Sequence, residues 1–410
     1  MTAFDPTSFR TGFPSLTSGI AHFDGPGGTQ TPARVGEAIA RTLTGPLSNR
    51  GGSVASQTNA ERAVAAFRSA YADLLGSDPA GVVHGRSATQ ITYDFSRHLA
   101  RGQDGRGWAP GDEVVVTRLD HDANVRPWIQ AAERAGATVR WIDLDPATAE
   151  ADLSDLDSVI NERTRLVAVT AASNLLGTRP PVRTIADRAH RHGALVYVDA
   201  VHHAAHAVVD PVGMGADFLV CSPYKFLGPH CAVLVAAPAL LDTLRPEKLV
   251  PSTDAVPERF EFGTLPYETL AGATEAVEVL ADLTGNGDPS VSRRERLALS
   301  QSAIDAHEDA LRLRVEEGLA AFGDRVVLHS RAADRTPTLF LTFPGRRSVE
   351  VSRALAERDV LAPAGSFYAH ETFARLALED DAGLRVGMAP YVTEGDVDRL
   401  LTALEEHLRP

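Results

Sequence analysis

The chain has 410 residues, 44% of them hydrophobic and 23% charged, which is the ordinary balance of a globular protein with room for a large and a smaller domain. Its formal net charge of −14 argues against nucleic acid or an anionic membrane as a partner, because both require clustered cations. Residues 1–13 lack the features of a secretory signal and no apolar stretch is long enough to span a bilayer, so we expect a cytoplasmic protein.

Apolar periodicity predicts helices and strands along the first two thirds of the chain. Residues 61–75 place apolar side chains at helical spacing. Short β-branched runs then predict strands at residues 113–117, 138–144, 165–171, 194–199, 217–221 and 232–236. Helical patterns lie between some of these runs, at residues 125–135 and 182–192. This alternation predicts an α/β fold with a mostly parallel sheet that helices cover on both faces.

The last third of the chain has a different pattern. Near residues 286–289 the composition turns to Gly, Asn, Asp and Pro, which predicts a break. A long helix, two strands and a terminal helix are predicted after it, at residues 291–322, 325–328, 338–343 and 394–408. We therefore expect a large domain at residues 20–285, and a small α+β domain formed by residues 1–19 and 286–410.

Lysine is almost absent from this sequence. Of its 40 lysine and arginine residues, only Lys225 and Lys248 are lysines. An exposed cation can be either residue type, but an amine that must lose its proton and attack a carbonyl cannot be arginine, whose guanidinium stays protonated. Lys248 lies in an expected exposed turn, whereas Lys225 follows the predicted strand 217–221. We therefore expect Lys225 to be retained for its chemistry.

An acid accompanies this lysine. Asp199 ends the predicted strand 194–199, and ligands of open α/β sheets bind beyond the carboxyl ends of the strands. Pyridoxal phosphate needs such a pair: the lysine forms a Schiff base and the carboxylate keeps the pyridine nitrogen protonated. For the pair alone, a structural aspartate and a surface lysine remain the alternative.

Two further segments support a cofactor site. Gly85 to Thr89 is a turn with glycine and hydroxyl groups that opens a helix from Gln90 onwards, so Ser87, Ala88 and Thr89 are candidates for binding phosphate or for ordinary capping. His121 follows the predicted strand 113–117 and could lie over a cofactor ring or be a polar loop residue.

Together these segments resemble the class V, fold-type I pyridoxal phosphate enzymes, specifically their cysteine desulfurase-like branch, from about residue 20 to the C-terminus. The most specific match is Asp199-Ala200-Val201-His202 followed by Ser222-x-Tyr224-Lys225. The resemblance implies a mostly parallel, seven-stranded type of sheet in the large domain. It assigns the Schiff base to Lys225, the pyridinium nitrogen to Asp199, the phenolic oxygen to His202, the phosphate to Ser222, Ala88 and Thr89, and ring stacking to His121.

The resemblance also implies how a substrate amino acid binds. Asn174 matches a residue near the phenolic oxygen and the substrate carboxylate, and Arg385 matches the arginine that clamps this carboxylate. Thr264 matches a threonine that reaches the phosphate of the partner subunit, which implies a homodimer with shared active sites. The loops that contain Gly28 and Arg50 are expected to line the substrate side, with simple turn chemistry as the alternative.

Two departures from the desulfurase pattern affect the expected reaction. Tyr224 stands where desulfurases carry histidine, and Tyr368 or a neighbour stands where they carry the persulfide-forming cysteine. The chain's two cysteines, Cys221 and Cys231, have apolar neighbours and are expected to be buried, reduced thiols. No Cys/His cluster has the spacing of a zinc site, so we expect no metal. A desulfurase of the usual mechanism is disfavoured, because it needs a mobile thiolate.

The remaining prediction is C–S bond cleavage of an S-substituted cysteine by β-elimination, with Lys225, His121 and Tyr224 as catalytic residues. The alternatives are transamination, epimerisation and decarboxylation-coupled oxidative deamination. The last is suggested by a weaker similarity to pyridoxal phosphate enzymes of lincosamide-type antibiotic pathways, a form of secondary metabolism, which process cysteine S-conjugates. A non-catalytic, cofactor-binding scaffold is the alternative from another class.

Overall fold

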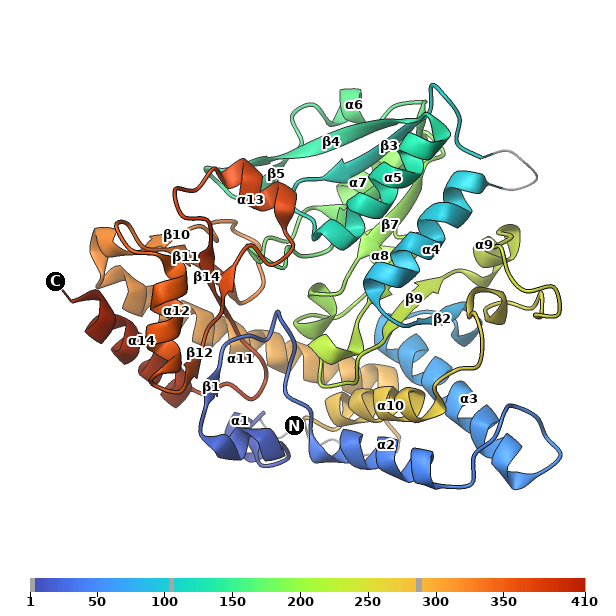
Figure 1. Cartoon of the computed structure of the whole chain (residues 1–410), viewed down its shortest axis with the longest axis horizontal. Coiled ribbons are helices and arrows are strands. Elements are labelled where there is room, and N and C mark those ends of the chain that lie inside the picture. The colour runs from blue at the N-terminus through green and yellow to red at the C-terminus, as the bar shows by residue number, and fades with distance from the viewer. Residues whose placement is uncertain (1–3, 103–106, 285–289, 410) are drawn as a thin grey trace.

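The computed structural model describes residues 4–102, 107–284 and 290–409, so the break predicted at residues 286–289 lies outside the described residues. Its main sheet has the strand order β2-β9-β8-β7-β6-β3-β4-β5 (Figure 1). The strands are β2 (Val82–Gly85), β3 (Glu113–Thr117), β4 (Thr138–Asp145), β5 (Glu150–Asp152), β6 (Thr164–Thr170), β7 (Leu195–Asp199), β8 (Phe218–Cys221) and β9 (Ala232–Ala236).

The prediction of a mostly parallel sheet is confirmed. Strands β8, β7, β6, β3 and β4 pair in parallel, whereas β9 is antiparallel to both of its neighbours and β5 is antiparallel to β4. Each of the six predicted strands agrees with an observed strand to within one residue at either end. The prediction missed β2 and β5 because β2 offers only two consecutive apolar residues and β5 only one.

Helices cover both faces of this sheet because successive residues of each buried strand point to opposite sides. Val114 and Val116 of β3 pack with side chains of one helical layer, and Val115 packs with those of the other. The first layer contains α4 (Ala88–Arg101) and α5 (Arg126–Ala135). The second contains α3 (Ala55–Leu75), α7 (Val182–Arg191), α10 (Tyr267–Ala281) and α11 (Arg293–Ala320). Helix α3 begins six residues before the predicted helix, and α4 begins two residues before its predicted start.

The C-terminal part contains a smaller, antiparallel sheet with the order β10-β11-β14-β13 (Figure 1). Its elements are β10 (Val327–Leu328), β11 (Thr338–Thr342), α12 (Ser348–Ala356), β13 (Ala364–Gly365), α13 (His370–Leu376), β14 (Gly383–Gly387) and α14 (Glu394–Leu408). The terminal helix has the predicted bounds, and the strand predicted at 325–328 forms only over its last two residues. The prediction missed β14 because Gly383, Arg385 and Gly387 interrupt its apolar pattern.

The N-terminal segment runs along this smaller sheet. Strand β1 (Ala21–His22) pairs in parallel with β12 (Val360–Leu361), and Asp24 forms a bridge with Gly387 of β14. The loop that follows Asp24 is thereby fixed between the two sheets. The division into domains at residues 20–285 and 286–410 stays a prediction.

The other helices are short or lie at the edge of the structure. They are α1 (Pro6–Arg10), α2 (Ala33–Thr44), α6 (Leu156–Val159), α8 (Pro211–Met214) and α9 (Pro238–Thr243). None of the helices in the described ranges has both the length and the apolar character that crossing a bilayer requires. In the same ranges, no three His, Cys, Asp or Glu side chains lie together as a metal ion would need.

The packing of the central strands generates a stability prediction. Leu219 of β8 is fully buried, so Leu219→Ala is expected to lower the free energy of unfolding by about 2–5 kcal/mol through lost burial and a residual cavity. The matched change Leu313→Ala, at a position that is 52% exposed on α11, is expected to cost less than about 1 kcal/mol. Urea denaturation followed by circular dichroism measures both, and equal costs would contradict this packing.

Candidate active site

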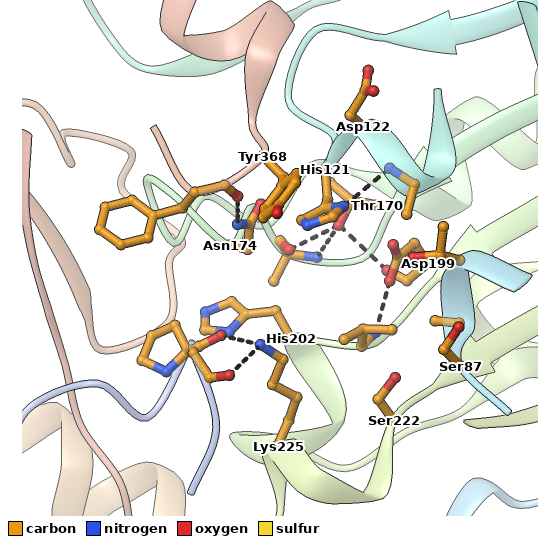
Figure 2. A pocket seen from close by; sticks show the side chains of 18 of the residues that line it. Ser87, His121, Asp122, Thr170, Asn174, Asp199, His202, Ser222, Lys225 and Tyr368 are labelled. Atoms are coloured by element: carbon orange, nitrogen blue, oxygen red, sulfur yellow. Dashed lines mark hydrogen bonds between the residues drawn. The ribbon is translucent and has the colours of Figure 1, made fainter. Parts of the chain in front are cut away.

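The strand ends of the main sheet deliver polar side chains to one cavity of about 690 Å³ (Figure 2). Asp199 ends β7, Lys225 lies four residues beyond β8, and His121 lies four residues beyond β3. Residues of the smaller sheet and of its loops close the other side of the cavity. The sequence-predicted residues that line it are Ser87, Ala88, Thr89, His121, Asn174, Asp199, His202, Ser222, Tyr224, Lys225, Tyr368 and Arg385.

Three predicted site residues do not line this cavity. Gly28 lies just behind it, where a Cβ atom would come within 3.3 Å of the Tyr224 ring. Arg50 is held elsewhere by ion pairs with Glu61 at 3.0 Å and Glu258 at 3.1 Å, so within this chain it does not reach the substrate side as expected. Thr264 is exposed, and its contact with the phosphate of a partner subunit stays a prediction.

Lys225 is a half-buried residue whose amine is held in place by backbone carbonyls. Its Nζ donates to the carbonyl oxygens of Pro26 and Gly27, the latter at 3.1 Å (Figure 2). Burial lowers the pKa of Lys225 to about 8, helped by the positive charge of Arg385 and opposed by Asp24 and Asp199. A substantial fraction of the amine is therefore neutral near physiological pH, which a nucleophile or base requires.

The second lysine has a different setting. Lys248 forms an ion pair with Asp254 at 3.1 Å and donates to the Ser252 carbonyl at 2.7 Å. Its side chain is 16% exposed, although Arg245, Glu247 and Leu249 around it are exposed, as expected for this segment. Lys248 does not line the cavity.

Asp199 is a buried carboxylate that faces the cavity from the end of β7. It accepts one hydrogen bond, from the Val201 N–H at 2.8 Å. Burial raises the pKa of Asp199 to about 6, while this hydrogen bond and the charge of Lys225 oppose the shift. The carboxylate is thus ionised at neutral pH and keeps lone pairs for a protonated ring nitrogen.

His121 presents a neutral, flat ring to the cavity. Its Nδ1 accepts from the Ala123 N–H at 3.0 Å, which leaves the proton on Nε2. Burial lowers the pKa of His121 to about 4, and the charges of Lys225 and Arg385 add to this shift. The ring stacks on Tyr368 with a centroid distance of 5.5 Å (Figure 2). Behind it, Asp120 accepts from Asn124 at 2.7 Å and from the Thr170 N–H at 3.1 Å, which fixes the turn that carries His121.

The N-terminus of α4 offers donors for an anion. Ser87 caps this helix by accepting from the Gln90 N–H at 3.1 Å. The N–H groups of Ala88 and Thr89 lie in the first turn, where a helix supplies no acceptors and the macrodipole is positive. Ser222 adds a buried hydroxyl after β8. These groups have the donor chemistry that a phosphate requires.

Arg385, on β14, lies at the side of the cavity that the smaller sheet forms, and it is only 3% exposed. One face of its guanidinium stacks on the Phe367 ring, 3.8 Å from the centroid. Its Nη2 donates to Asp24 Oδ1 at 2.8 Å and its Nη1 to the Asn174 carbonyl at 3.1 Å. The Asn174 amide in turn donates to the Phe367 carbonyl at 2.9 Å, so Asn174 links Arg385 to the 365–370 loop.

Three buried polar atoms of residues that line the cavity have no hydrogen-bond partner within the described residues: Asn174 Oδ1, His202 Nδ1 and Arg385 Nε. The other ring nitrogen of His202 bonds the hydroxyls of Thr336 and Thr338. An unpaired buried polar group is costly, so such atoms indicate a ligand. Together with the amine, the carboxylate and the helix N-terminus, these atoms form a set of hydrogen-bond donors and acceptors that fits pyridoxal phosphate.

The sequence pattern predicted no role for several side chains that line the cavity, namely Tyr93, Asp122, Arg126, Thr170 and Phe367, and it placed Asp24 only in a loop on the substrate side. Asp24 left a usable signal, since an acid directly precedes the glycine-rich loop that was expected near the substrate. Phe367 left none. It and Tyr368 have φ angles of 53° and 56°, a conformation that non-glycine residues rarely adopt.

The near-absence of lysine makes the amine directly measurable. In a cofactor-free Lys248→Arg protein, acetylation of Lys225 by acetic anhydride is expected to be half-maximal near pH 8, because only the neutral amine reacts and burial favours that form. After denaturation the midpoint is expected to return toward the ordinary value of 10.5. Peptide mass spectrometry quantifies the label, and a native midpoint near the ordinary value would contradict the described environment.

Known proteins share this fold and much of this sequence. A mycobacterial relative, an uncharacterized protein of Mycobacterium tuberculosis, is 32% identical over 98% of this chain and 99% of its own length. The probable cysteine desulfurase 2 of Mycobacterium leprae is 29% identical over 98% and 97% of the two chains. Among solved structures, the cysteine desulfurase CsdA from Escherichia coli superposes with a TM-score of 0.86 at 27% identity, covering 99% of both chains.

These similarities extend over almost the whole chain. They support a pyridoxal phosphate-dependent enzyme that is related to cysteine desulfurases. Residues 21–400 match the family described as Aminotransferase class-V, which spans both the main sheet and the smaller one. The chain belongs to the class V aminotransferase family, and its cofactor is pyridoxal phosphate.

Proposed function

We propose that this protein cleaves the C–S bond of an S-substituted cysteine by β-elimination. With one water molecule, the substrate yields a thiol, pyruvate and ammonia. The observation that carries the proposal is a cavity that is lined by the Lys225 amine and by no thiol, although both cysteines of the chain lie in the described residues. A class V site of this composition retains the base for elimination and lacks the nucleophile for sulfur transfer.

The two thiols are unsuited to carrying sulfur. Cys221 ends β8 and Cys231 directly precedes β9, and both are buried. Burial raises the pKa of Cys231 to about 12 and that of Cys221 well above its usual range. A persulfide mechanism needs an accessible thiolate, which neither residue provides.

The cofactor supplies one part of the chemistry: when bound, pyridoxal phosphate acts as an electron sink that acidifies the Cα–H of the attached amino acid. Asp199 supplies the negative charge that holds the ring nitrogen protonated. Ser87, Ala88, Thr89 and Ser222 would hold the phosphate, and the neutral ring of His121 would stack on the cofactor ring.

The protein residues would then move two protons. The neutral Lys225 amine accepts the Cα proton, and loss of the β-substituent as a thiolate follows. The pKa of Tyr224 is raised by burial and by Asp199, so its hydroxyl remains protonated at neutral pH and can donate to the departing sulfur. Arg385 and Asn174 would bind the substrate carboxylate, a task suited to a guanidinium.

Product analysis tests this function. The holoprotein is expected to release pyruvate from S-ethyl-L-cysteine without an added α-keto acid, in an assay coupled to lactate dehydrogenase. Lys225→Arg is expected to lower this rate by about 100-fold or more, because a guanidinium cannot accept the proton. Pyridoxal phosphate absorbance near the visible edge should also be lost in this variant.

Other outcomes would overturn the proposal in distinguishable ways. Turnover only with an α-keto acid would indicate transamination, and inversion at Cα would indicate epimerisation. Oxygen consumption with release of carbon dioxide would indicate oxidative decarboxylation. A holoprotein that binds the cofactor but transforms no cysteine conjugate would be a scaffold.

The cysteines provide a second, independent test. The double variant Cys221→Ala/Cys231→Ala is expected to keep the rate of pyruvate release within about a factor of two, because neither thiol reaches the cavity. Thermal unfolding of the same variant serves as a control for lost packing. A large loss of activity in a protein that is folded and loaded with cofactor would show that a thiol takes part in the reaction.

A further inference from the structure

Asp24 is a carboxylate at the site that the mechanism above does not use. Its Oδ1 accepts from Arg385 Nη2 at 2.8 Å, and it is the only carboxylate in an ion pair with Arg385 among the described residues. The arginine is almost fully buried, whereas the aspartate is one-third exposed. A buried guanidinium needs a compensating charge, and Asp24 supplies it.

Two glycines that follow Asp24 lie where any side chain would clash with neighbouring atoms. A Cβ atom at Gly27 would lie 2.2 Å from Asp24 Oδ2, and one at Gly25 would lie 2.1 Å from the Met388 carbonyl oxygen. No other residue fits either position without moving the backbone or the carboxylate. Gly27 therefore leaves room in this turn for the carboxylate that meets Arg385.

The same loop also holds the lysine segment. The carbonyls of Pro26 and Gly27 accept from the Lys225 amine, and the Thr29 N–H donates to the Tyr224 carbonyl at 3.0 Å. One short loop thus contacts the groups proposed to bind the substrate carboxylate and to move its Cα proton.

Arg385 retains donors for a second carboxylate. Phe367 covers one face of the guanidinium, and Asp24 and the Asn174 carbonyl each accept one N–H. Its Nε is buried and has no partner within the described residues. A substrate carboxylate at the remaining donors would share the cation with Asp24, and two carboxylates on one cation repel each other.

We infer that Asp24 is a positioning residue that aims Arg385 at the substrate carboxylate and, by its charge, limits the affinity of the site for that carboxylate. The inference rests on the proposed role of Arg385 in substrate binding. Asp24 would thereby select substrates with a single carboxylate at this end of the cavity, because its charge would repel any further negative charge there.

Binding of a simple carboxylate tests the inference without catalysis. Propionate, which has no amine to react, is titrated into the holoprotein by isothermal calorimetry. Asp24→Asn keeps an oxygen for Arg385 but removes the charge, so propionate is expected to bind about tenfold tighter. Asp24→Ala, which also removes the hydrogen bond, provides a second variant if the first fails to fold. Unchanged or weaker binding in a folded Asp24→Asn protein would overturn the inference.

Asp242→Asn is the matched control. Asp242 is 66% exposed and pairs at 2.7 Å with Arg259, a buried arginine that also donates to a backbone carbonyl, outside the cavity. This change should leave propionate binding as in the wild type. Arg385→Gln separates the two proposals: if it leaves propionate binding intact, the carboxylate role of Arg385 is wrong, and if it abolishes binding while Asp24→Asn changes nothing, only the inference about Asp24 fails.

The pKa of Lys225 gives a second readout, which would not change if the role of Asp24 were purely structural. The charge of Asp24 raises the pKa of Lys225, so Asp24→Asn is expected to shift the acetylation midpoint of the cofactor-free Lys248→Arg protein to lower pH. A midpoint that stays in place or rises would contradict the charge effect. The ionisable groups that face this amine, and that must stay unchanged in the comparison, are Asp199, Arg385, His121, His202 and Tyr224.

Discussion

The active site depends on one half-buried amine, that of Lys225, which lies among charges of both signs. Burial alone pushes the pKa of Lys225 down, and Arg385 pushes it further, while Asp24 and Asp199 oppose both effects. The pKa of Lys225 is therefore lower than that of an exposed lysine, but the amine remains a base. A chain that uses arginine almost everywhere else can keep this property only with lysine, because no environment of this kind deprotonates a guanidinium.

This balance requires parts of the chain that are distant in sequence to meet. Asp199 comes from the main sheet, Arg385 from the smaller sheet, and Asp24 from the N-terminal loop between them. The bridge between Asp24 and Gly387 holds the N-terminal loop against the strand that carries Arg385. Packing of the two sheets is therefore a condition of the chemistry as well as of stability.

The main strands of the sheet and most cavity residues could be predicted from the sequence. The elements and residues that were missed have physical reasons. Strands buried on both faces, such as β6 and β8, appear as continuous apolar runs, and Lys225 and Asp199 follow such runs. Strand β14 does not appear as a continuous apolar run, because it carries Arg385 in its centre. The ion pairs of Arg50 and the stacking of Phe367 on Arg385 depend on tertiary contacts that local pattern does not encode.

The loop at residues 365–370 connects the smaller sheet to the cavity through two residues with unusual backbone conformations. Phe367 and Tyr368 hold left-handed backbone conformations that cost energy, and hydrogen bonds from Asn174 and from the Asp122 N–H to their carbonyls keep them there. In this conformation Phe367 covers one face of Arg385, and Tyr368 stacks against His121. The loop therefore places two aromatic rings at the cavity, one over the guanidinium of Arg385 and one beside the ring of His121.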